Sequence, residues 1–245
     1  MTVVAGEHPL RLEDYSHCDG ALLTISARQG SYFAKQVAGD FNPIHDEHAK
    51  RFCVPGDLLF ALAVSRYGVR ERMDFNFAGM VGDGVGLRFP ERVDEEGAVT
   101  NDQGKPLLHM HFAGSARHEP GFCEALIREY VAFSGQNFPH ILVPLLARHG
   151  VMINPDRPLV IYESMSLSFA DLNASAPRLA LRDARLDVSG KRGEVQLAFD
   201  IEGGAGKVGE GSKKLAIGGL QPYDEARMEA LVAAFLVRKA GWKPD

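Results

Sequence analysis

The sequence predicts an α+β chain in which one unit, a helix wrapped by antiparallel strands, is built twice. In each half, a helical segment is followed by runs of alternating apolar and polar residues. In addition, the segments around Gly39 and Gly135 align without a gap and also pair Pro43 with Pro139. Such self-similarity at about half the chain length indicates duplication of one supersecondary unit. The length of 245 residues is sufficient for two cores.

The elements expected in the first half surround one buried helix. Residues 57–67 are apolar nearly all round, as in a helix buried on most sides, and Gly68 ends it. A helix at 27–37 and a helical segment from Asp46 precede it. Strands are expected at 20–26, 73–81, 85–93 and 105–115.

The second half repeats this plan and is followed by a separate helix. A helix is expected at 122–133, with strands at 159–169, 178–188, 194–201 and 207–217. Residues 224–239 form an amphipathic pattern that Asp224 caps. The predicted division of the chain is a tail at 1–18, units at 19–120 and 121–222, and a C-terminal helix within 223–245.

Composition excludes several classes of function. The net charge of −5 and the pI near 6.0 give no basic surface for nucleic acid or an anionic membrane. No apolar run approaches the roughly 20 residues of a membrane helix. The first residues lack the apolar segment of a signal peptide, so a cytoplasmic location is expected. Three widely spaced cysteines argue against a disulfide framework or a zinc finger.

One short segment, Gly39-Asp40-x-Asn42-Pro43-x-His45, carries the candidate chemistry. Asn-Pro favours a turn, which can fold the Asp40 carboxylate and the His45 imidazole toward one another. Such a pair can hold one water and exchange its protons, as the addition of water to a polarised double bond requires. Asn42 is expected to orient either partner. The alternative is an Asx-type turn in which Asp40 caps the backbone and His45 is only half exposed.

The segment 33–49 resembles the signature of the MaoC-like, (R)-specific enoyl-CoA hydratases of the hotdog superfamily. Met80-Val81-Gly82-Asp83 is similar to the Val-Gly-Asp turn of that family. The resemblance implies a double hotdog, with Asp40 and His45 as the catalytic pair. It also implies an acyl-CoA or acyl-carrier-protein thioester as substrate, no cofactor, and a possible homodimer of double-hotdog chains.

The chain departs from these hydratases before the buried helix, which indicates a separate bacterial branch. The segment after His45 is shorter, and Val54-Pro55-Gly56 replaces the His-Gly that begins the helix in the family. The amide of Gly56 can still stabilise negative charge on a thioester oxygen. Asp57 is either a favourable carboxylate in the first helical turn or the carboxylate of a different reaction.

The second half lacks the pair, because Gln136 stands opposite Asp40 and His140 is one position short of the counterpart of His45. It is therefore expected to be structural or a wall of the substrate channel. The predicted reaction is hydration of an enoyl thioester to the 3-hydroxyacyl form, or the reverse. The alternatives are a hotdog thioesterase that uses Asp57 and a non-catalytic module that binds an acyl thioester or acyl carrier protein.

Two other groups of residues suggest less specific chemistry. His109 and His111 lie on one side of a predicted strand, but no third ligand is apparent, so no metal is expected. Four basic residues could meet the phosphates of a CoA-type ligand, although scattered surface charge explains them equally well: Lys191, Arg192, Lys213 and Lys214.

Overall fold

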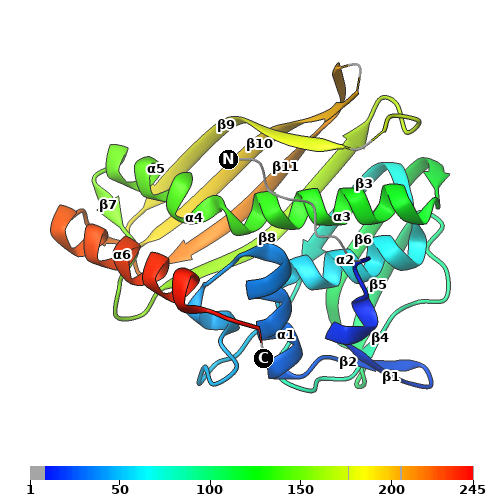
Figure 1. Cartoon of the computed structure of the whole chain (residues 1–245), viewed down its shortest axis with the longest axis horizontal. Coiled ribbons are helices and arrows are strands. Elements are labelled where there is room, and N and C mark those ends of the chain that lie inside the picture. Colours follow the sequence, from blue (N-terminus) through cyan, green and yellow to red (C-terminus); the bar gives the residue numbers. More distant parts are fainter. Residues whose placement is uncertain (1–8, 176, 205, 245) are drawn as a thin grey trace.

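A computed structural model describes residues 9–175, 177–204 and 206–244 and shows one continuous antiparallel sheet with helices packed on it (Figure 1). The strand order is β1-β2-β4-β5-β6-β3-β8-β11-β10-β9. The strands of the first half are β1 (His17–Asp19), β2 (Leu22–Thr24), β3 (Val69–Phe77), β4 (Leu87–Arg88), β5 (Glu96–Asn101) and β6 (Pro106–Arg117). Those of the second half are β8 (Leu159–Phe169), β9 (Arg178–Ser189), β10 (Arg192–Gly203) and β11 (Gly206–Gly218). A small second sheet pairs β7 (Val151–Met152) with β12 (Gln221–Pro222).

The two halves have the same strand topology, so the fold is a double hotdog of the α+β class. Outward from the junction, the first half runs β3-β6-β5-β4 and the second runs β8-β11-β10-β9. In both halves, the strand at the junction is the first of four in chain order. Moving outward from it, the neighbouring strands are the fourth, the third and the second. The predicted fold class and the internal repeat are therefore confirmed.

The halves share one core. β3 pairs with β8 from Arg72↔Ser168 to Asn76↔Ser164, which makes the sheet continuous. Above this junction, the Phe60 ring contacts Phe75 of the first half and Tyr130 of the second, with centroids 5.4 and 4.6 Å apart. Burial of these aromatic side chains joins the halves into one hydrophobic unit.

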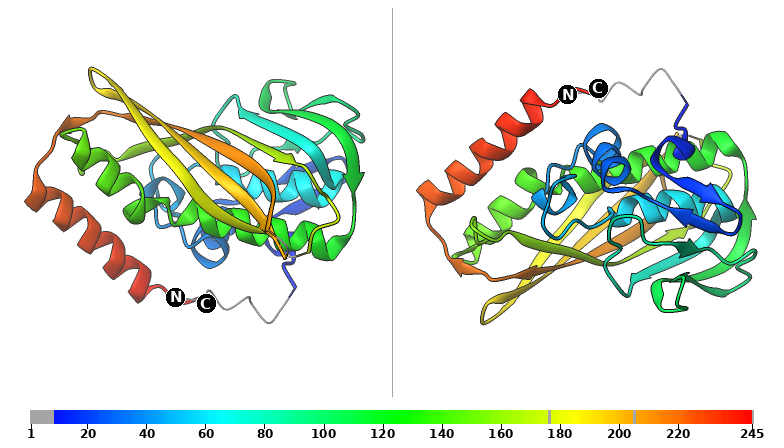
Figure 2. Two further views of the ribbon diagram at one scale, coloured as in Figure 1. Left: turned by 90° about the horizontal axis from the view of Figure 1, so that it is seen from above. Right: turned by 90° about the horizontal axis from the view of Figure 1, so that it is seen from below.

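The described α-helices include the four expected at 27–37, 57–67, 122–133 and 224–239. They are α1 (Ala27–Phe33), α2 (Gly56–Tyr67), α3 (Pro120–Gly135), α4 (Asn137–His140), α5 (Leu142–Arg148) and α6 (Glu225–Gly241). Helices α2 and α3 pack side by side (Figure 1). Asp224 caps α6 by accepting a hydrogen bond from the amide of Arg227. Helix α6 lies on the outer side of the other helices, away from the sheet (Figure 2).

Several local predictions are corrected by the structure. The segment from Asp46 is not helical, because Asn42 caps a short 3-10 helix (Pro43–His45) that ends where Asp46 becomes extended. The strand predicted at 85–93 is reduced to β4, and β5 was not predicted. In the segment predicted as a tail, where residues 1–8 lie outside the described part, Leu12 and Tyr15 are buried in the main core. Their apolar side chains attach this segment to the first half.

Among the described residues, no helix combines the length and the apolar character that crossing a membrane would require.

Candidate functional site

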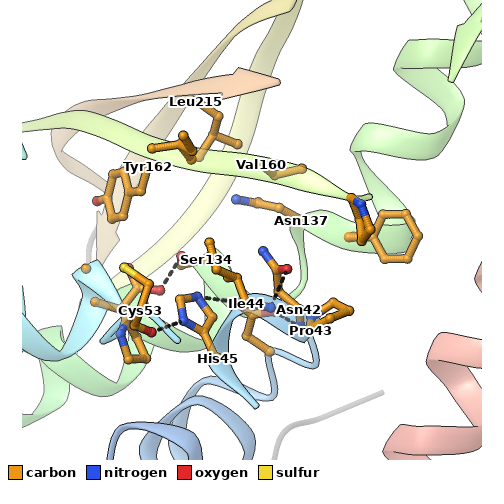
Figure 3. A pocket seen from close by; sticks show the side chains of 18 of the residues that line it. Asn42, Pro43, Ile44, His45, Cys53, Ser134, Asn137, Val160, Tyr162 and Leu215 are labelled. Atoms are coloured by element: carbon orange, nitrogen blue, oxygen red, sulfur yellow. Dashed lines mark hydrogen bonds and ion pairs between the residues drawn. The ribbon is translucent and has the colours of Figure 1, made fainter. Parts of the chain in front are cut away.

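A cavity of about 410 Å³ lies between the two halves and beneath α6. Figure 3 shows that the loop carrying Asn42, Pro43 and His45 forms one side, whereas Val160, Tyr162 and Leu215 of β8 and β11 face it from the other. The size is typical of a small-molecule site. Most of the wall is apolar and comes from both halves and from α6: Val54, Leu59, Phe77, Val81, Leu142, Ile153, Val160, Ile161, Leu215, Leu231 and Phe235.

The motif loop is held by its own backbone amides. Gly39, with φ of +65°, ends the helical segment before it, and such a left-handed conformation favours glycine. The Asp40 Oδ1 atom accepts a hydrogen bond of 2.8 Å from the amide of Asn42. The Asn42 Oδ1 atom accepts one of 3.3 Å from the amide of Ile44 and so caps the 3-10 helix. Asn42 therefore shapes the turn and contacts neither Asp40 nor His45 through its side-chain amide.

The turn brings Asp40 and His45 together on the cavity wall. The Nε2 atom of His45 is 3.7 Å from the Oδ2 atom of Asp40. On the other side of the ring, Nδ1 is 2.7 Å from the carbonyl oxygen of Cys53. Because a carbonyl can only accept a hydrogen bond, Nδ1 carries a proton, and in the neutral ring Nε2 has the free lone pair. The Asx turn and the Asp–His pair, treated above as alternatives, are therefore both present.

Gly56 begins α2 at the edge of the same cavity. A Cβ atom here would lie 2.8 Å from the Tyr162 ring and 3.1 Å from the Phe77 ring, so only glycine fits. Within the described part of the chain, the amides of Gly56 and Asp57 donate no hydrogen bond. These two N–H groups and the positive end of the helix dipole are available to a ligand oxygen.

Asp57 does not lie at the surface, as a first-turn carboxylate commonly does, but is 5% exposed. Its Oδ2 atom accepts a hydrogen bond of 2.5 Å from the hydroxyl of Ser134, at the end of α3. Its Oδ1 atom is 3.8 Å from the Nζ atom of Lys213 and has no hydrogen-bond partner in the described chain. Burial raises the pKa of Asp57, whereas Lys213 and Ser134 oppose the rise.

Lys213 completes this network from β11. Its ammonium donates a hydrogen bond to Ser134 and lies 3.9 Å from the centre of the Tyr162 ring. Burial lowers the pKa of Lys213, and the carboxylates of Asp57 and Asp40 oppose this change. The hydroxyls of Tyr162 and Tyr130 are hydrogen-bonded to each other, and burial raises the pKa of both phenols.

The structure thus brings together Asp40, Asn42, His45, Gly56 and Asp57, and adds Ser134 and Lys213 to them. Lys213 was considered above as a partner of CoA phosphates or as scattered surface charge, but it is 4% exposed and faces the cavity. A signal was present, because Leu215 and Ile217 occupy the buried face of β11, and a period of two places Lys213 on that face. No comparable pattern indicated Ser134.

The other candidates lie elsewhere. His109 and His111 are on the exposed face of β6, where His111 is 3.4 Å from Asp74. Across the residues that the structure describes, no group of three or more His, Cys, Asp or Glu side chains is arranged to hold a metal ion.

Comparison with solved structures gives matches of low sequence identity. A conserved protein of unknown function with a hot dog fold from Alicyclobacillus acidocaldarius is 11% identical, with a TM-score of 0.47, over 84% of this chain and 97% of that one. A putative thioesterase II from Thermobifida fusca YX is 13% identical, with a TM-score of 0.41, over 85% and 97% of the two chains. A MaoC-like dehydratase is 9% identical, with a TM-score of 0.39, over 83% and 99%.

No curated protein is significantly similar to the chain in sequence. Residues 10–226 match the family described as "Protein of unknown function (DUF3581)", and the chain belongs to that family. The matched range includes the polar residues of the site: Asp40, His45, Gly56, Asp57, Ser134 and Lys213.

Proposed function

We propose that the protein binds an acyl thioester in the cavity and catalyses reversible hydration of an enoyl thioester to the 3-hydroxyacyl thioester. One observation carries this proposal: Asp40 and His45 meet, 3.7 Å apart, on the wall of a largely apolar cavity. A water that contacts both the carboxylate and the free Nε2 lone pair has a base beside it and an acyl chain in front of it.

The reaction proceeds by transfer of one water proton through the pair. His45 takes a proton from the water through Nε2 as the water oxygen bonds to C3 of the enoyl group. The C2–C3 double-bond electrons move toward the thioester carbonyl, and the Asp40/His45 pair returns a proton to C2. The pair ends in its starting protonation state, so atoms and charge balance. The unpaired amides of Gly56 and Asp57 are suited to hold the carbonyl oxygen while it carries negative charge.

The test is hydration of crotonyl-CoA, followed as loss of the enoyl absorbance. His45→Ala and Asp40→Asn are each expected to lower kcat by about 100-fold or more, the usual contribution of general acid–base catalysis. His48→Ala and Glu47→Gln are matched controls, because both residues are exposed and neighbour the pair in sequence. Full activity in both His45→Ala and Asp40→Asn would refute the assignment.

Thioester hydrolysis is a second candidate, and the state of Asp57 favours it. Asp57 faces the cavity with one carboxylate oxygen unpaired, so it has an acceptor available for an attacking water. Release of free thiol from an acyl-CoA, abolished by Asp57→Asn and retained by Asp40→Asn, would identify this reaction instead. Both reactions require the thioester carbonyl to be polarised.

A further inference from the structure

Lys213 is a buried cation whose described neighbours accept only part of the hydrogen bonds that its ammonium can donate. It lies on the inner face of β11 with 3% of its side chain exposed, and it lines the cavity. An ammonium in such an apolar position is costly unless it is paired and hydrogen-bonded. The groups that accept hydrogen bonds from this ammonium therefore determine the cost of its burial.

The ammonium has three N–H donors, and among the described residues one of them has a hydrogen-bond acceptor. Ser134 accepts one hydrogen bond, whereas the Oδ1 atom of Asp57, at 3.8 Å, is beyond hydrogen-bond distance. On the remaining side, the face of Tyr162 attracts the cation without accepting a conventional hydrogen bond. In the part of the chain that the structure describes, no other group accepts from Lys213, so two donors remain for a ligand.

These donors lie beside the start of α2. The Tyr162 ring that contacts the ammonium also contacts Gly56, at 2.8 Å from the position of a Cβ atom. Asp57, the next residue, is the counter-ion of Lys213. The ammonium and the free amides at the start of α2 therefore adjoin the same corner of the cavity, where negative charge is stabilised by both.

We propose that Lys213 is a further catalytic residue that binds the carbonyl oxygen of the thioester and stabilises the negative charge that forms on it. This proposal rests on the proposed function in one respect, which is that the ligand is an acyl thioester. It holds for either reaction, because hydration and hydrolysis both place negative charge on the carbonyl oxygen. Asp57 and Ser134 act as positioning residues: Asp57 balances the charge of the lysine, and Ser134 fixes the direction of the ammonium.

The experiment measures polarisation of a bound carbonyl. Crotonyl-CoA labelled with ¹³C at the carbonyl is bound to the His45→Ala protein, which slows turnover, and its stretching frequency is recorded by isotope-edited infrared spectroscopy. The frequency is expected to be lower than in solution, and to return toward the solution value when Lys213→Met is added. Lys207→Met is the matched control, because Lys207 lies on the same strand, outside the cavity, and its half-exposed side chain is paired with Asp200 and Glu210. In otherwise wild-type protein, Lys213→Met is expected to lower kcat by about 100-fold, the effect of losing one donor to an oxyanion.

A second set of variants keeps the test decisive if Lys213→Met alone does not fold. Removing one partner of a buried ion pair leaves an uncompensated charge, whereas Asp57→Asn with Lys213→Met leaves none. The carbonyl shift is expected to be clearly smaller in the double variant than in Asp57→Asn alone, because only the amides at the start of α2 then remain to polarise the carbonyl. A shift of equal size with and without Lys213 refutes this proposal even if the enzyme hydrates crotonyl-CoA. A shift that depends on Lys213 supports it even if no hydration occurs.

Discussion

At the scale of single residues, five polar side chains of the cavity form one cluster: Asp40, His45, Asp57, Ser134 and Lys213. Ser134 is hydrogen-bonded to both Asp57 and Lys213, and the charges of Asp40 and His45 influence the pKa of Asp57. The remaining wall is mainly apolar, which suits an acyl chain. Because buried charges rarely improve stability over apolar side chains, packing alone does not account for this arrangement.

Cys53 gives a prediction at this scale. Its carbonyl orients His45, while its side chain is only partly exposed, and burial raises the pKa of Cys53 to about 11. At pH 8 only about one thiol in a thousand is then ionised, and the thiolate is the reactive form. We expect iodoacetamide to label Cys18, which is exposed, while Cys53 stays unmodified until the protein is unfolded.

Peptide mapping by mass spectrometry distinguishes the sites, and labelling in denaturant provides the control. Equal labelling of Cys18 and Cys53 in the native protein at pH 8 would contradict the burial of Cys53.

How far the sequence predicted the site depends on how local each contact is. Asp40 and His45 lie within one seven-residue motif, so their meeting follows from one turn. Ser134 contacts Asp57 and Lys213 across separations of 77 and 79 residues. Such contacts are fixed by the packing of the two halves. No local pattern reports them, although alternation in β11 indicated the face on which Lys213 lies.

At the scale of elements, the long segments were predictable and the short ones were not. Strands β8 to β11 and helix α3 have clear periodicity, because each packs one face over many residues. Helix α2 was recognisable instead as a run that is apolar nearly all round. In contrast, β4 has two residues, and the connection after His45 is held by turn hydrogen bonds such as that from the Cys53 amide to the Ile44 carbonyl. Such short pieces carry too few residues for a period to be seen.

Helix α6 closes one side of the cavity and is attached near its end by an ion pair. Arg238 donates to both carboxylate oxygens of Asp46, at 2.8 and 2.7 Å. Because about a third of each side chain is exposed, the pair contributes at most about 1 kcal/mol. We expect Arg238→Ala to speed hydrogen exchange in the last turns of α6 by up to about fivefold.

The matched control is Arg227→Ala, near the start of the same helix, which is expected to leave exchange at the far end unchanged. Exchange is measured by mass spectrometry at low salt, where such pairs are strongest. Equal protection of the last turns in Arg238→Ala and in the wild type would show that aromatic contacts alone, such as Phe235 with Phe41, hold the helix.

At the scale of the whole molecule, two halves of the same strand topology share the candidate site between them. The first half contributes the Asp40/His45 pair and the start of α2, whereas the second contributes Ser134, Tyr162 and Lys213. The second half thus supplies polar groups as well as a wall, although its counterpart of the motif has no Asp–His pair. The strand order is the same in both halves, but each half provides a different part of the cavity.

Since the main core crosses the β3–β8 junction, we expect the molecule to unfold in one cooperative transition. Phe60 of the first half and Phe199 of the second are fully buried, and both contact Tyr130. Phe60→Ala and Phe199→Ala are each expected to lower the free energy of unfolding by about 3–5 kcal/mol.

Unfolding in guanidinium is followed by far-ultraviolet circular dichroism and by the fluorescence of Trp242, the one tryptophan in the chain. Trp242 contacts Phe41 and Tyr32 of the first half, so its fluorescence reports on that half, whereas Phe199 lies in the second. If the halves were independent, Phe199→Ala would leave the fluorescence transition in place and shift only part of the dichroism signal. A shared core requires that both signals shift together in both variants.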